Sequence, residues 1–397
     1  MLETRIAKEL AYISQAGLAR RITELYFVNP AQAQDRTGKT YLVLASNNYL
    51  GFTHAPEVIE AASRAALKFG TGSSGSRLTT GGTFIASELE KRLADFKHSE
   101  SALVFNTGYM TNLGVLYGLL QTGDVVFSDE LNHASIIDGC RISRCKVVVY
   151  KHNDMADLQR LLETEIVTGQ RFIVTDGVFS MDGDIADLPS LAVLKKQFNA
   201  CLIVDDAHGV GVIGNDGSGT ASHYGLTDVI DLQVGTLSKA LAAEGGYVAG
   251  KKILIDYLIN RSRPFIFSTA LAPATLAAAN AALLLLQTQA SKYIDSLRAN
   301  SRLMRRLLLE GGLNVVEGIT PIIPVVIGEA GLTMQFADRL KSKGILVSGI
   351  RPPTVHHGES RLRITVTAAH CEEQLRQAAQ IITALWQELK HGEKKEG

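Results

Sequence analysis

The chain has 397 residues, of which 46% are hydrophobic and 20% charged, and its formal net charge is +0 at pH 7. The length favours two packed units, and the neutral charge balance offers no basic field for nucleic acid or an anionic membrane. No apolar run is long enough for a transmembrane helix, and the N-terminus lacks a signal-peptide core. Four cysteines without CxxC or zinc-type spacing fit a reducing cytoplasm.

The first two thirds of the chain alternate helical patterns with short β-rich runs. Apolar residues at helical spacing predict helices over residues 57–69, 84–96, 155–163 and 188–198. The β-rich runs predict strands at residues 102–105, 125–128, 146–150, 172–175, 201–205, 232–236 and 247–250. Buried strands that alternate with helices favour an α/β fold with a mostly parallel sheet flanked by helices, in which ligands bind at the carboxyl ends of the strands.

The pattern changes from about Pro273 onward and predicts a smaller α+β domain. Its predicted elements are a long helix over 274–309, a strand pair near 315–327, a helix over 332–342, strands at 345–349 and 361–367, and an amphipathic helix over 372–389. We expect an N-terminal segment of residues 1–45, a large cofactor-binding domain of residues 46–285 and a small C-terminal domain of residues 286–397.

Two predicted strands end in residues that suit pyridoxal phosphate (PLP) chemistry. Lys239 follows one buried run, and Asp205, Asp206 and His208 follow another. PLP enzymes need an amine for a Schiff base and a carboxylate beside the pyridine nitrogen. Most lysines are solvated, however, and paired aspartates often serve as turn or capping residues. Spacing alone leaves open which aspartate would meet the nitrogen.

Two glycine-containing segments are candidates for phosphate or substrate contacts. Residues 106–109 open a helical pattern directly after a strand, and the free N–H groups of a helix start suit a phosphate, although Tyr109 could equally serve packing. Residues 70–75 satisfy G-x-G-x-x-G, but a helical pattern precedes them, which disfavours a dinucleotide site. A loop close to the substrate and a plain flexible loop both remain open.

Three further candidate side chains lie just after or within a predicted strand. His133 follows the strand at 125–128 and could stack on a pyridine ring, although a histidine satisfied by local hydrogen bonds is the commoner case. Arg361 and Arg363 alternate along one predicted strand and therefore share a face. A guanidinium there could clamp a carboxylate with two hydrogen bonds, and a solvated strand face is the alternative.

Ordered motifs along nearly the full length resemble the α-oxoamine synthases, a fold-type I group of PLP-dependent transferases. The motifs are SNNYLG (46–51), GTGSSGSRL (70–78), NTGYMTN (106–112), NHASIIDG (132–139), DGVFSMDGD (176–184), DDAHGVGVIG (205–214), GTLSKA (235–240), FSTALAP (267–273) and IRPPTVHHGESRLRITVTAAH (350–370). The chain departs from several relatives by carrying Ser238 before the lysine and Ala240 after it. These two residues leave the resemblance to the family intact but make it less specific for one substrate.

The resemblance implies a PLP site with catalytic roles for four residues. Lys239 would hold PLP, Asp205 would pair with the pyridine nitrogen, His208 would meet the ring hydroxyl and His133 would stack on the ring. The resemblance also implies cofactor contacts from residues near the ring and the phosphate, namely Ser180, Gly108, Tyr109 and Thr236, with Ser268 and Thr269 reaching the phosphate from the other subunit of a homodimer.

The resemblance further implies the substrate contacts and the reaction. Arg361 would bind the amino acid carboxylate with Asn47 close by, and Arg21 would bind the acyl substrate, with Arg20 an equally plausible register. The implied reaction joins an amino acid to an acyl-CoA or acyl carrier protein thioester with loss of carbon dioxide. Segment 350–370 is most similar to the family member that uses L-alanine and a pimeloyl thioester in the biotin pathway.

Other functions remain as alternatives to this interpretation. Within the family, the member that joins glycine to acetyl-CoA is the nearest competitor, and a long-chain enzyme of the serine palmitoyltransferase kind ranks lower. A silent partner subunit is a different class, but such subunits usually lack the lysine, so the presence of Lys239 argues against it.

Overall fold

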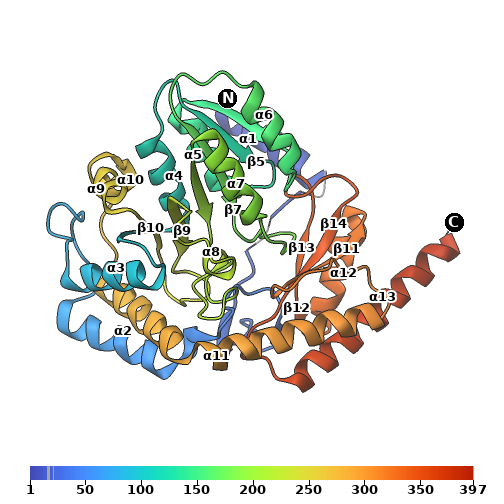
Figure 1. Ribbon diagram of the computed structural model, residues 1–397. Coiled ribbons are helices and arrows are strands. Elements are labelled where there is room, and N and C mark those ends of the chain that lie inside the picture. Colours follow the sequence, from blue (N-terminus) through green and yellow to red (C-terminus); the bar gives the residue numbers. More distant parts are fainter. Residues whose placement is uncertain (16–17, 21, 397) are drawn as a thin grey trace.

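The computed structural model describes residues 1–15, 18–20 and 22–396, and it is organised around a seven-stranded sheet (Figure 1). The strand order is β4-β10-β9-β8-β7-β5-β6; β10 is antiparallel to both of its neighbours, and the other paired strands run parallel. The strands are β4 (Ser101–Phe105), β5 (Val125–Asp129), β6 (Lys146–Tyr150), β7 (Arg171–Asp176), β8 (Ala200–Asp205), β9 (Leu232–Thr236) and β10 (Gly246–Gly250). All seven coincide with predicted strands to within a residue at either end.

Helices cover both faces of this sheet and so bury its strands on both sides. Along β7, Phe172 and Val174 belong to one apolar core, whereas Ile173 belongs to the core on the opposite face. The first core is completed by α4 (Gly108–Leu119), α5 (Ala134–Ser143), α9 (Lys252–Arg261) and α10 (Arg263–Phe267). The opposite face is covered by α3 (Phe84–Phe96), α6 (Met155–Thr164) and α7 (Leu188–Phe198), and the short helix α8 (Thr220–His223) follows the Asp205–Gly214 segment.

The C-terminal part forms a smaller unit beside the main sheet, at the right of Figure 1. Its antiparallel sheet has the order β11-β14-β13, and α12 and α13 pack together next to it. The elements are β11 (Ile322–Gly328), α12 (Ala330–Ser342), β12 (Ile345–Leu346), β13 (Ser348–Ile350), β14 (Ser360–Thr365) and α13 (Glu372–Glu396). The long helix α11 (Pro273–Glu310) runs along the lower edge of both parts in Figure 1, and its backbone leaves helical geometry at Gln289.

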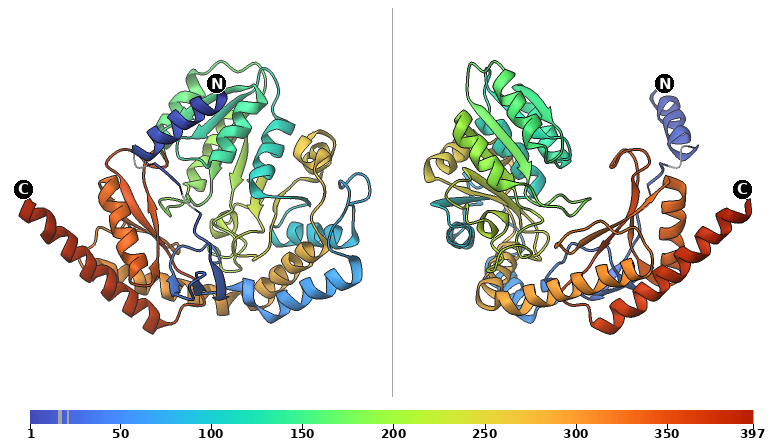
Figure 2. Two further views of the ribbon diagram at one scale, coloured as in Figure 1. Left: turned by 180° about the vertical axis from the view of Figure 1, so that it is seen from behind. Right: turned by 45° about the vertical axis from the view of Figure 1, so that its right-hand side comes forward.

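The N-terminal strands belong to the same sheet as a strand of the C-terminal part. The order of this sheet is β1-β2-β3-β12, with β12 parallel to β3. The N-terminal elements are α1 (Leu2–Gln15), β1 (Tyr26–Asn29), β2 (Gln32–Gln34), β3 (Thr40–Val43), η1 (Phe52–His54) and α2 (Pro56–Phe69). Helix α1 has no buried residue and stands apart from the rest of the chain in the right-hand view of Figure 2.

Two predicted strands near the C-terminus take a different form. The predicted pair near 315–327 is one strand, β11, with a single isolated bridge from Val315 to Val325, because Gly318 and Pro321 interrupt the segment between them. The predicted strand at 345–349 divides into β12 and β13, which pair in different sheets. No helix within the described residues has the length and apolarity that a membrane crossing needs.

Candidate active site

A cavity of about 180 Å³ lies at the carboxyl ends of β7, β8 and β9, beside the start of α4. This is the edge at which ligands bind in parallel sheets. Its lining contains most of the predicted cofactor residues and four that were not predicted as site residues. The lining residues are Gly108, Tyr109, Asn112, His133, Ser135, Asp176, Ser180, Asp205, Ala207, His208, Thr236 and Lys239.

Lys239 lies just beyond the end of β9 and contacts His208 in the cavity. Its Nζ is 2.7 Å from Nε2 of His208, and Nδ1 of that ring is 2.6 Å from the hydroxyl of the fully buried Tyr49. Burial lowers the pKa of Lys239 to about 8, although the nearby Asp205 and Asp176 oppose the shift. Burial also lowers the pKa of His208 well below its ordinary value, and the charge of Lys239 adds to this effect. A neutral imidazole therefore stands beside an amine that loses its proton readily.

The two adjacent aspartates after β8 point to different surroundings. Asp205 lines the cavity, where its Oδ2 accepts a hydrogen bond of 2.6 Å from Asn112 and its Oδ1 accepts one of 3.0 Å from the Ala207 N–H. Asp206 instead pairs with the fully buried Lys97 at 2.9 Å, away from the cavity lining. Of the two, only Asp205 is therefore placed to meet a group bound in the cavity.

His133 and Asp176 also line the cavity and contact each other. His133 caps the start of α5, its Nδ1 is 2.8 Å from the Ser135 hydroxyl, and its backbone N–H donates to Asp176 at 3.0 Å. Burial lowers the pKa of His133, with Asp205 opposing the shift. Burial raises the pKa of Asp176 well above its usual range, and the neighbouring Asp205 carboxylate raises it further.

The start of α4 closes one end of the cavity and suits a phosphate. Thr107 caps this helix by accepting from the Met110 N–H at 3.0 Å, so the first N–H groups of the helix, at Gly108 and Tyr109, have no intrahelical partner. A Cβ on Gly108 would come within 3.3 Å of the Thr236 side chain, so a larger residue would crowd this end. Helix N-termini with free N–H groups bind phosphates readily.

The two arginines of β14 have different partners, although they share a strand face as predicted. Arg361 forms ion pairs with Asp182 and with Glu359, the latter at 3.2 Å. Arg363 donates to the Ser180 carbonyl and to Asn47 Oδ1, the latter at 3.2 Å. The charge of Arg363 also lowers the pKa of both His208 and Lys239. Neither arginine lines the cavity itself, but Arg363 is the one whose charge reaches His208 and Lys239 and whose guanidinium contacts Asn47.

Three other predicted residues are not gathered around the cavity in the single chain. Ser268 directly follows α10, and Thr269 is exposed. The Thr269 carbonyl accepts a hydrogen bond of 2.7 Å from the Asn106 side-chain amide. Arg21 lies outside the described residues, and the alternative register, Arg20, is exposed. The predicted contribution of Ser268 and Thr269 to a neighbouring subunit stays a prediction.

Five residues near the cavity were not singled out as site residues from the sequence: Tyr49, Asn112, Ser135, Asp176 and Ala207. Asp176 had a detectable signal, because it directly follows the predicted strand at 172–175 and opens the recognised motif at 176–184. In the structure it pairs in register with Asp205 on the next strand. Tyr49 and Asn112 lie within the recognised motifs but reach the site through contacts with residues 159 and 93 positions away. Local pattern carries no information on such contacts.

This set of groups fits PLP. The cavity offers a primary amine at Lys239, a carboxylate at Asp205, a histidine ring at His133 and a helix N-terminus, which match the aldehyde, pyridine nitrogen, ring and phosphate of that cofactor. Among the described residues no group of three or more His, Cys, Asp or Glu side chains could hold a metal ion.

Comparison with known proteins places the chain in a family. It matches the aminotransferase class I and II family over residues 39–382. It is similar to the 8-amino-7-oxononanoate synthases of Lysinibacillus sphaericus (47% identity, covering 94% of this chain and 96% of the relative) and Trichlorobacter lovleyi (49% identity, covering 97% and 98%). A solved structure of a lysine-to-alanine variant of S. paucimobilis serine palmitoyltransferase with a bound PLP–myriocin aldimine is 31% identical, with a TM-score of 0.91 and 97% of each chain covered.

The chain therefore belongs to the aminotransferase class I and II family and, within it, to the α-oxoamine synthases. The predicted family and fold class are confirmed by these similarities.

Proposed function

We propose that this protein is a PLP-dependent acyltransferase that condenses L-alanine with a pimeloyl thioester, giving 8-amino-7-oxononanoate, the free thiol and carbon dioxide in biotin biosynthesis. The observation that carries the reaction class is the half-buried Lys239 amine, 2.7 Å from His208 in a cavity shared with Asp205. The choice of substrates is supported by the name shared by curated relatives that are 47% and 49% identical over nearly the whole chain.

PLP, when bound, supplies an aldehyde for a Schiff base and a protonated pyridine that accepts electrons from the amino acid. Asp205 would keep the pyridine nitrogen protonated, and Asn112 and the Ala207 N–H would hold this carboxylate in place. His208 would meet the ring hydroxyl, with the Tyr49 hydroxyl fixing the orientation of the imidazole. His133 would lie against the ring, and Ser180 would lie at its margin.

Phosphate binding would fall to the start of α4 and to Thr236. Gly108 and Tyr109 would donate backbone N–H groups there. We further propose a homodimer in which Ser268 and Thr269 of each subunit complete the other subunit's phosphate site. Support comes from α1, whose apolar residues Leu2, Ile6 and Leu10 are all exposed in the single chain, as is Phe267 beside Ser268.

Lys239 would act as the base that removes the α-proton of the amino acid. A lysine with a pKa of about 8 is partly neutral near physiological pH and can take up a proton, as a catalytic base must. The α-carbon would then bond to the thioester carbonyl carbon as the C–S bond breaks, and the thiolate would leave and take a proton from solvent. The β-keto acid would lose the amino acid carboxylate as carbon dioxide. The proton that Lys239 holds can return to the same carbon to complete the cycle.

The amino acid carboxylate would be bound by Arg363 with Asn47. The contacts of Arg363 support this assignment over Arg361, whose guanidinium is taken up by Asp182 and Glu359. Arg361 would then act through Asp182. On the acyl side, Arg20 or Arg21 remains the proposed contact, and either CoA or an acyl carrier protein could deliver the acyl group.

The proposed organisation has three parts: an N-terminal segment of residues 1–45, a large PLP-binding domain of residues 46–285 and a small domain of residues 286–397. The departure from helical geometry at Gln289 in α11 supports a boundary close to residue 285. The pairing of β3 with β12 implies that the N-terminal segment moves with the small domain. We also propose a reducing, cytoplasmic setting, since all four cysteines are unpaired.

A paired turnover assay tests the proposed function. Purified protein with PLP would be given L-alanine plus pimeloyl-CoA, or glycine plus acetyl-CoA, and thiol release would be followed. We expect a clear preference for the first pair. Preference for the second pair would move the chain to the glycine C-acetyltransferases, and thiol release with neither pair would reject both assignments.

A further inference from the structure

A short hairpin, residues 177–186, connects β7 to the segment before α7 and carries part of the proposed substrate site. Backbone hydrogen bonds close it: the Phe179 N–H donates to the Asp184 carbonyl at 3.0 Å, and the Ala186 N–H donates to the Gly177 carbonyl at 3.0 Å. We call this segment the 177–186 hairpin. It leaves the main sheet at the same edge as Asp205.

The tip of the 177–186 hairpin touches the small domain through the β14 arginines. The Ser180 carbonyl accepts from Arg363, and the Asp182 carboxylate pairs with Arg361. The Gly183 carbonyl accepts a hydrogen bond of 2.7 Å from the Thr320 hydroxyl. The position of this tip therefore sets the position of Arg363, the residue proposed to bind the amino acid carboxylate.

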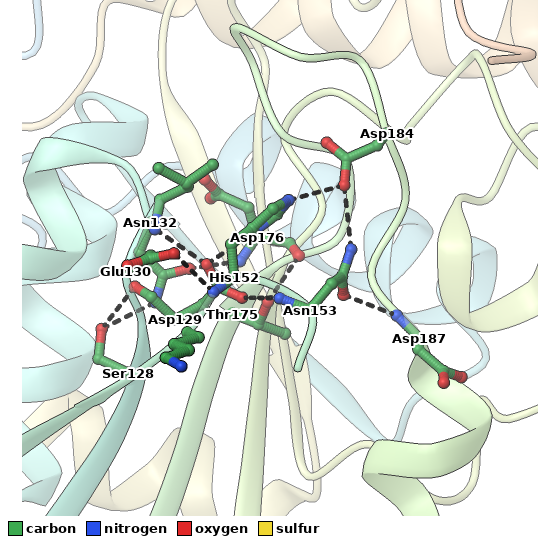
Figure 3. Close-up of polar contacts among 12 residues, drawn as sticks. Ser128, Asp129, Glu130, Asn132, His152, Asn153, Thr175, Asp176, Asp184 and Asp187 are labelled. Atoms are coloured by element: carbon green, nitrogen blue, oxygen red, sulfur yellow. Dashed lines mark hydrogen bonds and ion pairs between the residues drawn. The ribbon is translucent and has the colours of Figure 1, made fainter. Parts of the chain in front are cut away.

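His152 holds the other side of the 177–186 hairpin to the main sheet (Figure 3). Its Nε2 is 2.9 Å from Asp184 Oδ2 on the hairpin, and its Nδ1 is 3.0 Å from Asp129 Oδ1 at the end of β5. The backbone N–H of His152 donates a hydrogen bond of 2.9 Å to Glu130 Oε1. The His152 ring packs edge-on against the Phe179 ring, with the ring centroids 4.4 Å apart. The imidazole thus bridges the sheet and the hairpin.

The two partners of His152 require a particular protonation state. Ionised carboxylates only accept hydrogen bonds, so both ring nitrogens must donate, and the ring must be an imidazolium. Burial alone lowers the pKa of His152, but hydrogen bonds to Asp129 and Asp184 outweigh it and raise the pKa to about 10. The bridge is therefore intact across the neutral range.

Asn153 reinforces the same connection. Its side-chain amide donates to Asp184 Oδ2 at 3.0 Å and to the Ile185 carbonyl at 3.2 Å, while its Oδ1 accepts from the Asp187 N–H at 3.2 Å (Figure 3). Its backbone N–H donates to Asp129 Oδ2 at 3.0 Å. The adjacent residues His152 and Asn153 therefore each donate a hydrogen bond to the Asp184 carboxylate, and both bonds are strengthened by its charge.

We propose that His152 is a positioning residue for amino acid binding: its imidazolium ties the 177–186 hairpin to β5, and the hairpin in turn holds Arg363 at the carboxylate of the amino acid. The inference rests on the proposed function for the identity of the ligand. His152 itself lies outside the cavity lining, so it acts through the hairpin and not on the reacting atoms.

The test compares His152→Asn with His98→Asn in the PLP-loaded enzyme. Asn at position 152 is too short to reach both carboxylates, so the tie to Asp184 is lost. His98 offers a matched control, because it also pairs with an aspartate, Asp216, at 3.4 Å, but on the exposed surface away from the 177–186 hairpin. Asp184→Asn, which keeps the side-chain shape and removes one charge, is the second test variant.

Two readouts separate positioning from general damage. We expect His152→Asn to raise KM for alanine about tenfold, with kcat and KM for the thioester changed less than about threefold, because binding of the carboxylate is what weakens. Spectral titration should show weaker binding of alanine and unchanged binding of ethylamine, which has the same amine and methyl group without the carboxylate. Hydrogen exchange of residues 177–186 should accelerate in His152→Asn and Asp184→Asn and stay unchanged in His98→Asn.

Failure of the proposed function and failure of the proposed role of His152 would give different results. If the unaltered protein uses neither alanine nor glycine, the proposed function fails, and the hydrogen exchange result still decides whether His152 holds the hairpin. Wild-type alanine binding together with wild-type exchange in both test variants would overturn the inference. Equal weakening of alanine and ethylamine would overturn it as well, since that result would place the defect at the cofactor.

Discussion

The fully buried Lys97 and the half-buried Lys239 lie near two adjacent aspartates, and the contrast between these pairs separates a structural role from a chemical one. Lys97 has no exposed surface and pairs with Asp206 at 2.9 Å, and Asp206 also accepts hydrogen bonds from the Thr220 N–H and hydroxyl. Lys239 lies across the cavity lined by Asp205 and contacts the neutral ring of His208. The first pair is closed on all sides, and the second is open to a ligand.

The end of β8 thus supplies one carboxylate for a structural ion pair and another for a bound ligand. Alternation at the end of β8 directs Asp205 and Asp206 to opposite sides, so one carboxylate is consumed by a structural ion pair and its neighbour stays available. A buried pair that is fully satisfied fixes geometry, whereas an amine whose pKa is lowered to about 8 can exchange its proton. Substitution of Lys239 should therefore mainly reduce turnover, and substitution of Lys97 should mainly reduce stability.

Lys239→Ala should give the largest effect on activity. Without the amine there is neither a Schiff-base partner for PLP nor a base for the α-proton, so turnover should fall by about a thousandfold or more. The unfolding midpoint of the PLP-free protein should not fall at neutral pH, because burial disfavours the charged amine in the folded state there. Turnover and thermal unfolding measured on one preparation check this, and retention of full turnover would refute the proposed mechanism.

Lys97→Met should give the opposite result, a large loss of stability. Removing one partner of a buried ion pair leaves Asp206 buried and uncompensated, which costs about 3–5 kcal/mol of unfolding free energy. Adding Asp206→Asn should recover part of this loss, because the stranded charge is then gone. Denaturant unfolding of the single and double variants measures both steps. A double variant less stable than Lys97→Met alone would show that the charge is not the source of the loss.

Arg363→Lys and Arg361→Lys test which arginine of β14 binds the amino acid carboxylate. Lysine cannot reproduce the forked geometry of arginine at a carboxylate, so Arg363→Lys should raise KM for alanine by about 10–100-fold. Arg361→Lys should raise it by only about threefold, because the Arg361 guanidinium is already paired with Asp182 and Glu359. Steady-state kinetics with varied alanine decide between them, and the reverse order would restore the assignment made from the sequence.

The arginines also show how far the sequence could predict this site. Alternation correctly placed Arg361 and Arg363 on one face, but the partner that occupies Arg361 is Asp182, 179 residues earlier in the chain. Elements whose signals are local, such as β6, β9 and α7, were predicted to the residue. The choice between Asp205 and Asp206, the Tyr49 contact and the bridge at His152 all depend on contacts between segments far apart in sequence, which periodicity and spacing cannot report.

The smallest expected effect is a pH dependence of stability that belongs to His152. Its pKa is raised from 6.5 to about 10 by Asp129 on β5 and Asp184 on the 177–186 hairpin, with Glu130 bonded to its backbone. A folded-state pKa above the unfolded value means that the folded protein binds the extra proton between these limits. The stability contributed by this proton is complete below about pH 6.5 and is lost as pH rises toward 10.

The difference in unfolding free energy between the unaltered protein and His152→Asn should therefore shrink steadily from pH 6.5 to 10. Lys239 provides a contrast of opposite sign, because its pKa is lowered from 10.5 to about 8, and in the PLP-free protein its contribution should grow with pH between those values. Denaturant unfolding of the PLP-free protein, His152→Asn and Lys239→Ala across this range measures both trends. A constant difference for His152→Asn would mean that its ring is neutral in the folded protein, and then one of its two carboxylate contacts could not be a hydrogen bond.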